Sequence, residues 1–404
     1  MGRNYNRFRR FCAFIIGAVF FVSGLMKLLD PVGTGLVISE YYRFFGTGFL
    51  IPTAKPAGVV LAMTETLLGA ALMTGLWRRI IAILSIIMIC GFTVVTVILV
   101  IFNPEMDCGC FGEAVHLTHF QSLVKNIVLC ALAATAFTPI GRLGRPKRRK
   151  YFSFTIVAAS VLGFCIYSLM YIPLVDFTDF KASSRLAASV RESQDMYDAV
   201  FTYEKDGVRE TFTLDNLPDS TWTYVSTETV KSEDSSDGSY PSLSITDANG
   251  EYRDKIAVNG KVLAISVYDP ESMSGTKWET AANLIPAAID AGYYPIVLSA
   301  GNFGILAASL AAKTDSDTAE AILQSAYYAD YKTLVTLNRS NGGATYFHNG
   351  YLIRKWAARN LPGSADLEKT AIGHADETVA ETTTAGHLAF QAFLLYTFAI
   401  ILFV

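Results

Sequence analysis

Three features are scarce or missing in this sequence: net charge, internal repetition, and cysteine in the second half of the chain. The formal net charge is -3 over 404 residues, which gives no basis for binding nucleic acid. No internal repeat or low-complexity tract is present, so the chain is not a repeat protein. No cysteine follows Cys165, so the second half cannot perform thiol chemistry.

The residues that are present fall into two populations. Up to about residue 175 the sequence consists almost entirely of long apolar runs, whereas residues 176–381 have the mixed composition of a water-soluble domain. A segment of that size can bury its own core without a metal or a disulfide. The composition therefore predicts a membrane region joined to a soluble domain.

Six apolar segments are candidates for membrane spans, because a helix needs about 20 apolar residues to cross a bilayer. They are residues 11–29, 57–77, 80–102, 120–139, 152–172 and 388–404. The last is marginal in length. The first has the basic flank of a signal peptide, but no small-residue cleavage site follows it, so we interpret it as an uncleaved span.

Clusters of basic residues predict the orientation of these spans. They lie at residues 3–10, 78–79 and 142–150, and the positive-inside rule assigns all three to the cytoplasm. The N-terminus is then cytoplasmic, and the loops 30–56 and 103–119 lie outside together with the soluble domain.

The predicted organisation has four parts. Residues 1–140 form a transmembrane bundle, residues 141–175 a basic cytoplasmic loop and the fifth span, residues 176–384 a periplasmic α/β domain, and residues 385–404 a C-terminal hydrophobic helix that forms the sixth span.

Within the soluble domain, the order of elements predicts an α/β sandwich of thioredoxin type. An Asp-Gly turn and an Asn-Gly turn each indicate a hairpin. Short apolar runs indicate strands that are buried on both faces. The expected elements are a hairpin over 197–213, strands at 261–268, 294–299 and 334–337, a helix over 276–291, and a hairpin over 344–356.

Two of the six cysteines differ from the others. Four lie inside predicted spans, where a cysteine behaves as a small hydrophobic residue, whereas Cys108 and Cys110 follow the third span in a turn-forming stretch. A disulfide across the single Gly109 would close a small, strained ring that is easily reduced, which favours a redox-active dithiol. Flanking Asp107 and Glu113 would raise the thiol pKa values, and the N-terminus of the following helix would lower them.

A metal site is an alternative for this loop. His116 and His119 follow the cysteine pair, and thiolates and imidazoles bind zinc or copper. Their spacing matches no closed zinc motif, and His119 could instead cap the fourth span. A third interpretation is a purely structural turn or bridge.

Two ionisable residues inside the spans are further candidates. Lys27 lies near the outer end of the first span, and Glu65 lies about two turns into the second from the same side. Charges at such depths usually pair or face the interior of a bundle, so we expect a Lys27–Glu65 pair beneath the cysteine loop. Lys125 and Asn126 add polar groups at the same level.

Several of these motifs together resemble the DoxX/MauE family of redox-associated integral membrane proteins. They are Phe21-Val-Ser-Gly-Leu-Met-Lys27 with Asp30-Pro31, Glu65 before Gly69, and Asp107-Cys-Gly-Cys-Phe-Gly112 followed by Lys125-Asn126. The stretch from Met196 to Trp222 is similar to an appended domain of Bacteroidetes members, which implies a Gram-negative inner membrane.

The second half resembles the thioredoxin fold more loosely. The loop that would carry Cys-x-x-Cys reads Asp269-Pro-Glu-Ser-Met-Ser-Gly275, and Ala344 stands where that fold has a cis-proline. The resemblance therefore implies a degenerate thioredoxin-like domain that binds rather than reacts.

Three functions follow as hypotheses. The resemblance implies an oxidoreductase component in which Cys108 and Cys110 exchange with a periplasmic thiol protein, quinone accepts the electrons, and Lys27 and Glu65 tune or shuttle protons. A second hypothesis is a non-enzymatic, membrane-anchored assembly factor that binds a partner. A third is a metal-binding membrane protein that uses Cys108, Cys110, His116 and His119.

Overall fold

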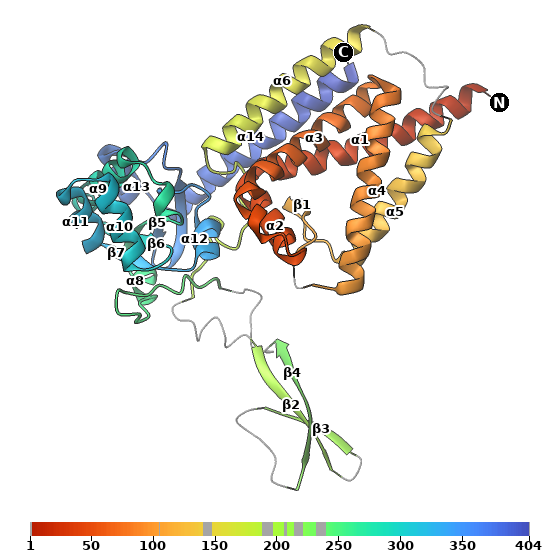
Figure 1. Cartoon of the computed structure of the whole chain (residues 1–404). Helices are drawn as coiled ribbons and strands as arrows, with labels where there is room; N and C mark the ends of the chain where they lie inside the picture. Colours follow the sequence, from red (N-terminus) through yellow and green to blue (C-terminus); the bar gives the residue numbers. More distant parts are fainter. Residues whose placement is uncertain are drawn as a thin grey trace. The chain divides into compact units, whose positions relative to one another are not determined.

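The computed structural model describes residues 2–104, 106–139, 148–187, 197–205, 208–213, 221–231 and 240–403. The chain divides into two compact units, one of Met1–Thr178 with Glu381–Val404 and the other of Asp179–Ala380 (Figure 1). Each unit has its own hydrophobic core, so each is described by itself.

The first unit is a helical bundle. Its elements are α1 (Gly2–Leu29), α2 (Pro31–Phe44), the 3-10 helix η1 (Gly48–Thr53), α3 (Ala54–Thr74), α4 (Arg78–Phe102), β1 (Cys110–Glu113), α5 (His119–Phe137), α6 (Arg148–Met170) and α14 (Ala375–Phe403). Among the described residues, six helical segments are long and apolar enough to cross a membrane, as the sequence predicts. The chain is therefore a multi-pass membrane protein.

Two corrections apply to the bundle. The sixth apolar helix is not marginal, because its apolar helical stretch covers Ala375–Leu402, 28 residues. The loop expected over residues 30–56 contains α2, which the sequence reading missed. Asp30 caps α2 by accepting a hydrogen bond from the Gly33 backbone N–H (2.9 Å), with Pro31 in the first helical position, a favourable helix start.

Glycines bring α1 and α3 unusually close together. A Cβ atom added at Gly17 would lie 2.8 Å from the carbonyl oxygen of Gly69, so only a residue without a side chain fits there. This contact fixes the register of the two helices, and it places Glu65, one turn before Gly69, against the C-terminal half of α1.

The second unit contains two sheets. One has the order β3-β2-β4, built from β2 (Tyr197–Lys205), β3 (Val208–Thr213) and β4 (Thr223–Lys231), all antiparallel. The β2–β3 hairpin is as predicted, although its turn lies outside the described residues, as does most of the polar stretch 232–240.

The other sheet has the order β7-β6-β5-β8-β9. Its strands are β5 (Lys261–Val267), β6 (Tyr294–Ser299), β7 (Ala326–Tyr328), β8 (Gly343–His348) and β9 (Tyr351–Trp356). The neighbours β7, β6 and β5 run parallel, whereas β8 runs antiparallel to both β5 and β9. The sheet is therefore mixed, and the predicted strands at 261–268 and 294–299 and the last hairpin are confirmed.

Helices cover both faces of this sheet. They are α8 (Lys255–Val258), η4 (Pro270–Ser272), α9 (Gly275–Asp290), α10 (Phe303–Lys313), α11 (Ser316–Gln324), α12 (Tyr331–Leu337) and α13 (Ser364–Ile372). One core joins alternate residues of β5 to Trp278 of α9 and Leu367 of α13. The other joins Val262 and Ala264 of β5 to Leu334 of α12.

The strand predicted at residues 334–337 is wrong, because these residues form part of α12. The Asp330 side chain accepts hydrogen bonds from the backbone N–H groups of Lys332 (2.8 Å) and Thr333 (3.2 Å). This cap starts a helix, and a four-residue apolar run alone does not distinguish a strand from a buried helix.

Candidate functional site

Cys108 and Cys110 lie in a tight turn between α4 and α5, and their sulfur atoms are 3.5 Å apart with no covalent bond. Gly109 between them has φ +61°, a conformation that favours glycine. A Cβ atom there would also come within 2.5 Å of Val37 in α2. Both requirements explain why glycine separates the cysteines, and the short S–S separation allows the two thiols to act as one redox pair.

The predicted ion pair is present directly beneath this turn. Lys27 Nζ lies 2.6 Å from Glu65 Oε2, and the two residues are 5% and 1% exposed. Lys27 Nζ also donates to the carbonyl oxygen of Cys110 (2.8 Å) and to Ser23 Oγ (2.9 Å). A buried charge pair is stable only when further hydrogen bonds satisfy it. Here those bonds tie the cysteine turn to α1 and α3.

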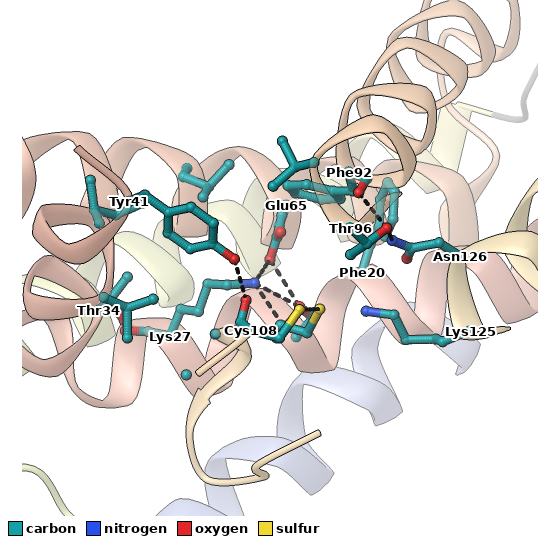
Figure 2. A pocket seen from close by; sticks show the side chains of 18 of the residues that line it. Phe20, Lys27, Thr34, Tyr41, Glu65, Phe92, Thr96, Cys108, Lys125 and Asn126 are labelled. Carbon is teal, nitrogen blue, oxygen red and sulfur yellow. Dashed lines mark hydrogen bonds and ion pairs between the residues drawn. The ribbon is translucent and has the colours of Figure 1, made fainter. Parts of the chain in front are cut away.

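Two more hydroxyl groups hold the backbone of the turn. Ser23 Oγ lies 2.6 Å from the Cys110 carbonyl oxygen, and Tyr41 Oη of α2 donates to the Cys108 carbonyl oxygen at 2.8 Å (Figure 2). Burial, with the nearby thiols, raises the pKa of Tyr41, so this phenol stays a hydrogen-bond donor. Both carbonyls of the pair are thus fixed, which limits movement of the sulfur atoms.

The surroundings make the two thiols chemically unequal. The hydrogen bond from the Cys108 thiol lowers the pKa of Cys110 to about 5, against the opposing effect of burial, and the Lys125 ammonium lowers it further. The same hydrogen bond, together with burial, raises the pKa of Cys108. Ser122 Oγ lies 3.6 Å from Cys110 Sγ. Cys110 is therefore the thiolate of the pair, and the thiolate is the nucleophile.

A cavity of about 410 Å³ opens next to the cysteine pair. Aliphatic and aromatic side chains form most of its wall, including Phe20 of α1 and Phe92 of α4. The polar residues that line it are Ser23, Lys27, Thr34, Tyr41, Tyr42, Glu65, Thr96, Cys108, Cys110, Lys125 and Asn126, several of which Figure 2 labels. An apolar pocket with a few converging polar groups is the usual form of a small-molecule site.

His116 and His119 of the loop have hydrogen-bond partners other than the cysteines. His116 Nδ1 lies 3.1 Å from Asp107, and His119 Nε2 lies 3.0 Å from the carbonyl oxygen of Met106. Across the described part of the chain, no three His, Cys, Asp or Glu side chains gather in a way that could hold a metal ion. The structure therefore does not bring together the four residues of the metal hypothesis.

The capping role considered for His119 is wrong. Thr118 caps α5, and it forms a reciprocal capping box with Gln121, because a hydroxyl in this position can accept from the N3 backbone N–H.

Sequence reasoning missed three residues of the site: Ser23, Tyr41 and Ser122. A signal existed for Ser23, since it precedes Lys27 by four residues and shares its helix face. Tyr41 had none, because its position depends on α2, a helix that was not expected. Ser122 faces Cys110 only because of how α5 packs.

Comparison with known proteins gives a family match for part of the bundle. Residues 6–139 match the family model described as Methylamine utilisation protein MauE, and residues 197–233 match a Domain of unknown function (DUF8463). Searches of curated proteins and of solved structures found no match. The matched segment contains the cysteine turn, the Lys27–Glu65 pair and the cavity. Residues 6–139 of this multi-pass membrane protein therefore belong to the MauE family.

Proposed function

We propose that this protein is a thiol–disulfide redox component of the inner membrane, with Cys108 and Cys110 as its redox pair. The observation that carries the proposal is the pair itself. Two unbonded sulfur atoms lie 3.5 Å apart, their backbone carbonyls are held by Lys27, Ser23 and Tyr41, and one thiol has an acid-shifted pKa. Low thiol pKa values are typical of cysteines that exchange disulfides.

The exchange moves two electrons and two protons from the partner to the cysteine pair. In the oxidised state, a thiolate of a periplasmic partner attacks the Cys108–Cys110 bond and forms a mixed disulfide. The partner's second thiolate then breaks that mixed disulfide. The partner gains a disulfide and loses two electrons and two protons, and the Cys108–Cys110 pair becomes a dithiol.

The reduced pair needs an electron acceptor, and we propose a membrane quinone. The cavity volume falls within the roughly 300–1,000 Å³ that small-molecule sites occupy, and its wall is mainly apolar next to the cysteines. Bound there, a quinone would supply a two-electron, two-proton acceptor. Lys125 and Asn126 face the same space, and Asn126 Nδ2 uses one of its two N–H groups on Thr96 (3.1 Å), so both residues offer N–H donors that can orient a carbonyl group.

Lys27 and Glu65 serve, on this proposal, to position the turn and to hold protons near it. Their contact of 2.6 Å and the bond from Lys27 Nζ to the Cys110 carbonyl connect an ionisable pair to the backbone of the cysteine that carries the thiolate. Ser23 lies within hydrogen-bond distance of both Glu65 (3.0 Å) and that carbonyl, which gives a short chain of exchangeable protons.

We further propose that the soluble domain is thioredoxin-like and periplasmic, and that it binds the partner without reacting with it. The strand order β6-β5-β8-β9, with a parallel pair followed by an antiparallel hairpin, supports that fold. Asn341 closes the loop where a thioredoxin would carry its cysteines. Its amide donates to Asp269 O (2.7 Å) and Ser272 Oγ (3.0 Å). The cysteine-free sequence of this domain also suits an assembly factor.

The test is disulfide trapping in cells with the full-length chain. With Cys108→Ser, the Cys110 thiolate can attack the disulfide of an oxidised partner and release one partner thiolate. No Cys108 thiol is then present to complete the exchange, so a mixed disulfide should accumulate and disappear on reduction. The double variant Cys108→Ser/Cys110→Ser should show none, and Cys12→Ser should behave as wild type. If the double variant supports normal oxidation of periplasmic thiols and Cys108→Ser traps no partner, the assembly-factor hypothesis replaces this one.

A further inference from the structure

A second pocket lies at the end of the bundle opposite the cysteines. It has a volume of about 510 Å³ and lies between the beginnings of α1 and α4 and the ends of α3 and α5. Three arginines line it, Arg9, Arg10 and Arg78, above a wall that includes Phe14 and Phe137. No acidic side chain is among the described residues that line it.

The arginines differ in what they contact. Arg9 is buried and donates to the carbonyl oxygens of Ala136 (3.0 Å) and Pro139 (3.1 Å) at the end of α5, so it has a structural role. Arg78 donates through Nε to Gly75 O at 3.0 Å. Within the described residues Arg10 makes no hydrogen bond or ion pair, and its charge acts on that of Arg78. Two guanidinium groups thus repel each other across an open pocket.

The helix segments that line the pocket carry no carboxylate to relieve this repulsion. Residues 1–29, 66–104 and 114–175 contain no Asp or Glu. The nearest acid along the helices is Glu65, which is paired with Lys27. Lys27 follows Arg10 by 17 residues on α1, so the two positions are roughly 25 Å apart at 1.5 Å per residue. That distance exceeds the Debye length of about 8 Å, so no carboxylate on the described parts of these helices neutralises the two arginines.

The level of the pocket is consistent with a headgroup region. Trp77, which precedes Arg78, is 46% exposed and packs edge-on against the rings of Tyr151 and Phe154. Aromatic residues of this kind gather at membrane interfaces. Basic pockets between membrane helices bind the headgroups of anionic lipids, and arginine matches phosphate oxygens with two parallel hydrogen bonds.

We infer that this pocket binds a phosphate group, supplied either by an anionic phospholipid or by free phosphate, between Arg10 and Arg78. The apolar wall beneath the arginines suits the glycerol and first acyl carbons of a lipid, and Arg9 shapes the floor by anchoring the end of α5. The site is separate from the cysteine pair and does not depend on the proposed redox function.

The test uses the purified full-length protein in detergent and measures lipid binding by native mass spectrometry. Phosphatidylglycerol should bind in preference to phosphatidylcholine. The variant Arg10→Gln/Arg78→Gln should lose this preference, with affinity about tenfold weaker. The matched control Arg148→Gln/Arg149→Gln removes two charges near the start of α6, outside the pocket, and should keep it. Arg10→Lys/Arg78→Lys keeps the charges and serves as a second variant should the glutamine pair fail to fold; it should retain the preference with reduced affinity.

Inorganic phosphate alone distinguishes the two sources. If it raises the melting temperature of the wild type but not of Arg10→Gln/Arg78→Gln, and phosphatidylglycerol adds nothing, the ligand is the free ion. The inference is overturned if phosphatidylglycerol binds no better than phosphatidylcholine to the wild type. It is also overturned if the pocket variant and the control lose binding equally, because the effect is then one of total charge.

Discussion

The membrane bundle and the soluble unit both bury polar side chains, but they use them differently. In the soluble unit, Asn338 donates to Ala344 O (3.1 Å) and Trp356 O (3.2 Å), and Asn341 donates to Asp269 O. These side-chain amides supply hydrogen-bond donors to backbone carbonyl oxygens of the same unit. In the bundle, Lys27 pairs with Glu65 and donates to the carbonyl oxygen of Cys110 beside a cavity.

Buried polar groups of these two kinds have different effects on stability. A buried amide that caps a loop stabilises a fold, whereas a buried charge pair often adds little net stability compared with apolar residues of similar volume. All six cysteines lie in the bundle, and the soluble unit has none. The proposed function places reaction in the bundle and recognition in the soluble unit, and the following changes test that proposal.

The largest effect should come from breaking the ion pair on one side. Glu65→Ala leaves Lys27 buried without its carboxylate, so we expect a loss of about 3–5 kcal/mol of stability, measured as the thermal unfolding of the detergent-solubilised protein. The double variant Lys27→Met/Glu65→Leu should recover most of this loss and still impair thiol exchange. Recovery of both stability and exchange would show that the pair is only structural.

A smaller effect should follow from removing a buried amide in the soluble unit. Asn338→Ala leaves two buried carbonyl oxygens with one partner fewer, so the unit should lose about 1–3 kcal/mol. Alkylation of Cys108 and Cys110 should proceed at the wild-type rate. A changed rate would contradict the proposal that the cysteine pair reacts independently of the soluble unit.

The pH profile of alkylation should report the environment of Cys110. Its pKa of about 5 means that the thiolate persists as the pH falls from neutral and is lost as the pH passes below about 5. Lys125→Met removes a positive charge that stabilises the thiolate, so the profile should move to higher pH, by about one unit. The control Lys150→Met, outside the cavity, should leave the profile unchanged.

The smallest effect is expected at the loop histidine. His116→Ala removes an exposed contact with Asp107, which should change stability by less than about 1 kcal/mol, and chelators should not alter thiol exchange. Loss of exchange in either case would restore the metal hypothesis.

Sequence patterns predicted those parts of the molecule that depend on period and composition. Span lengths and the Asn349-Gly350 hairpin are local properties, and the pairing of Lys27 with Glu65 followed from their similar depths in adjacent spans. Parts that depend on packing were not predictable. The contact of Tyr41 with the cysteine turn requires α2, and α12 arises from the Asp330 cap rather than from its apolar run.

The central claim is that Cys108 and Cys110 interconvert between dithiol and disulfide as one unit. The most direct measurement is differential alkylation of the full-length protein in native membranes across a series of redox buffers, read by mass spectrometry of the peptide that contains both residues. The account predicts a single two-electron transition in which both cysteines change together, with Cys12 and Cys165 unaffected. A pair that stays fully reduced, or fully oxidised, throughout the series would contradict it.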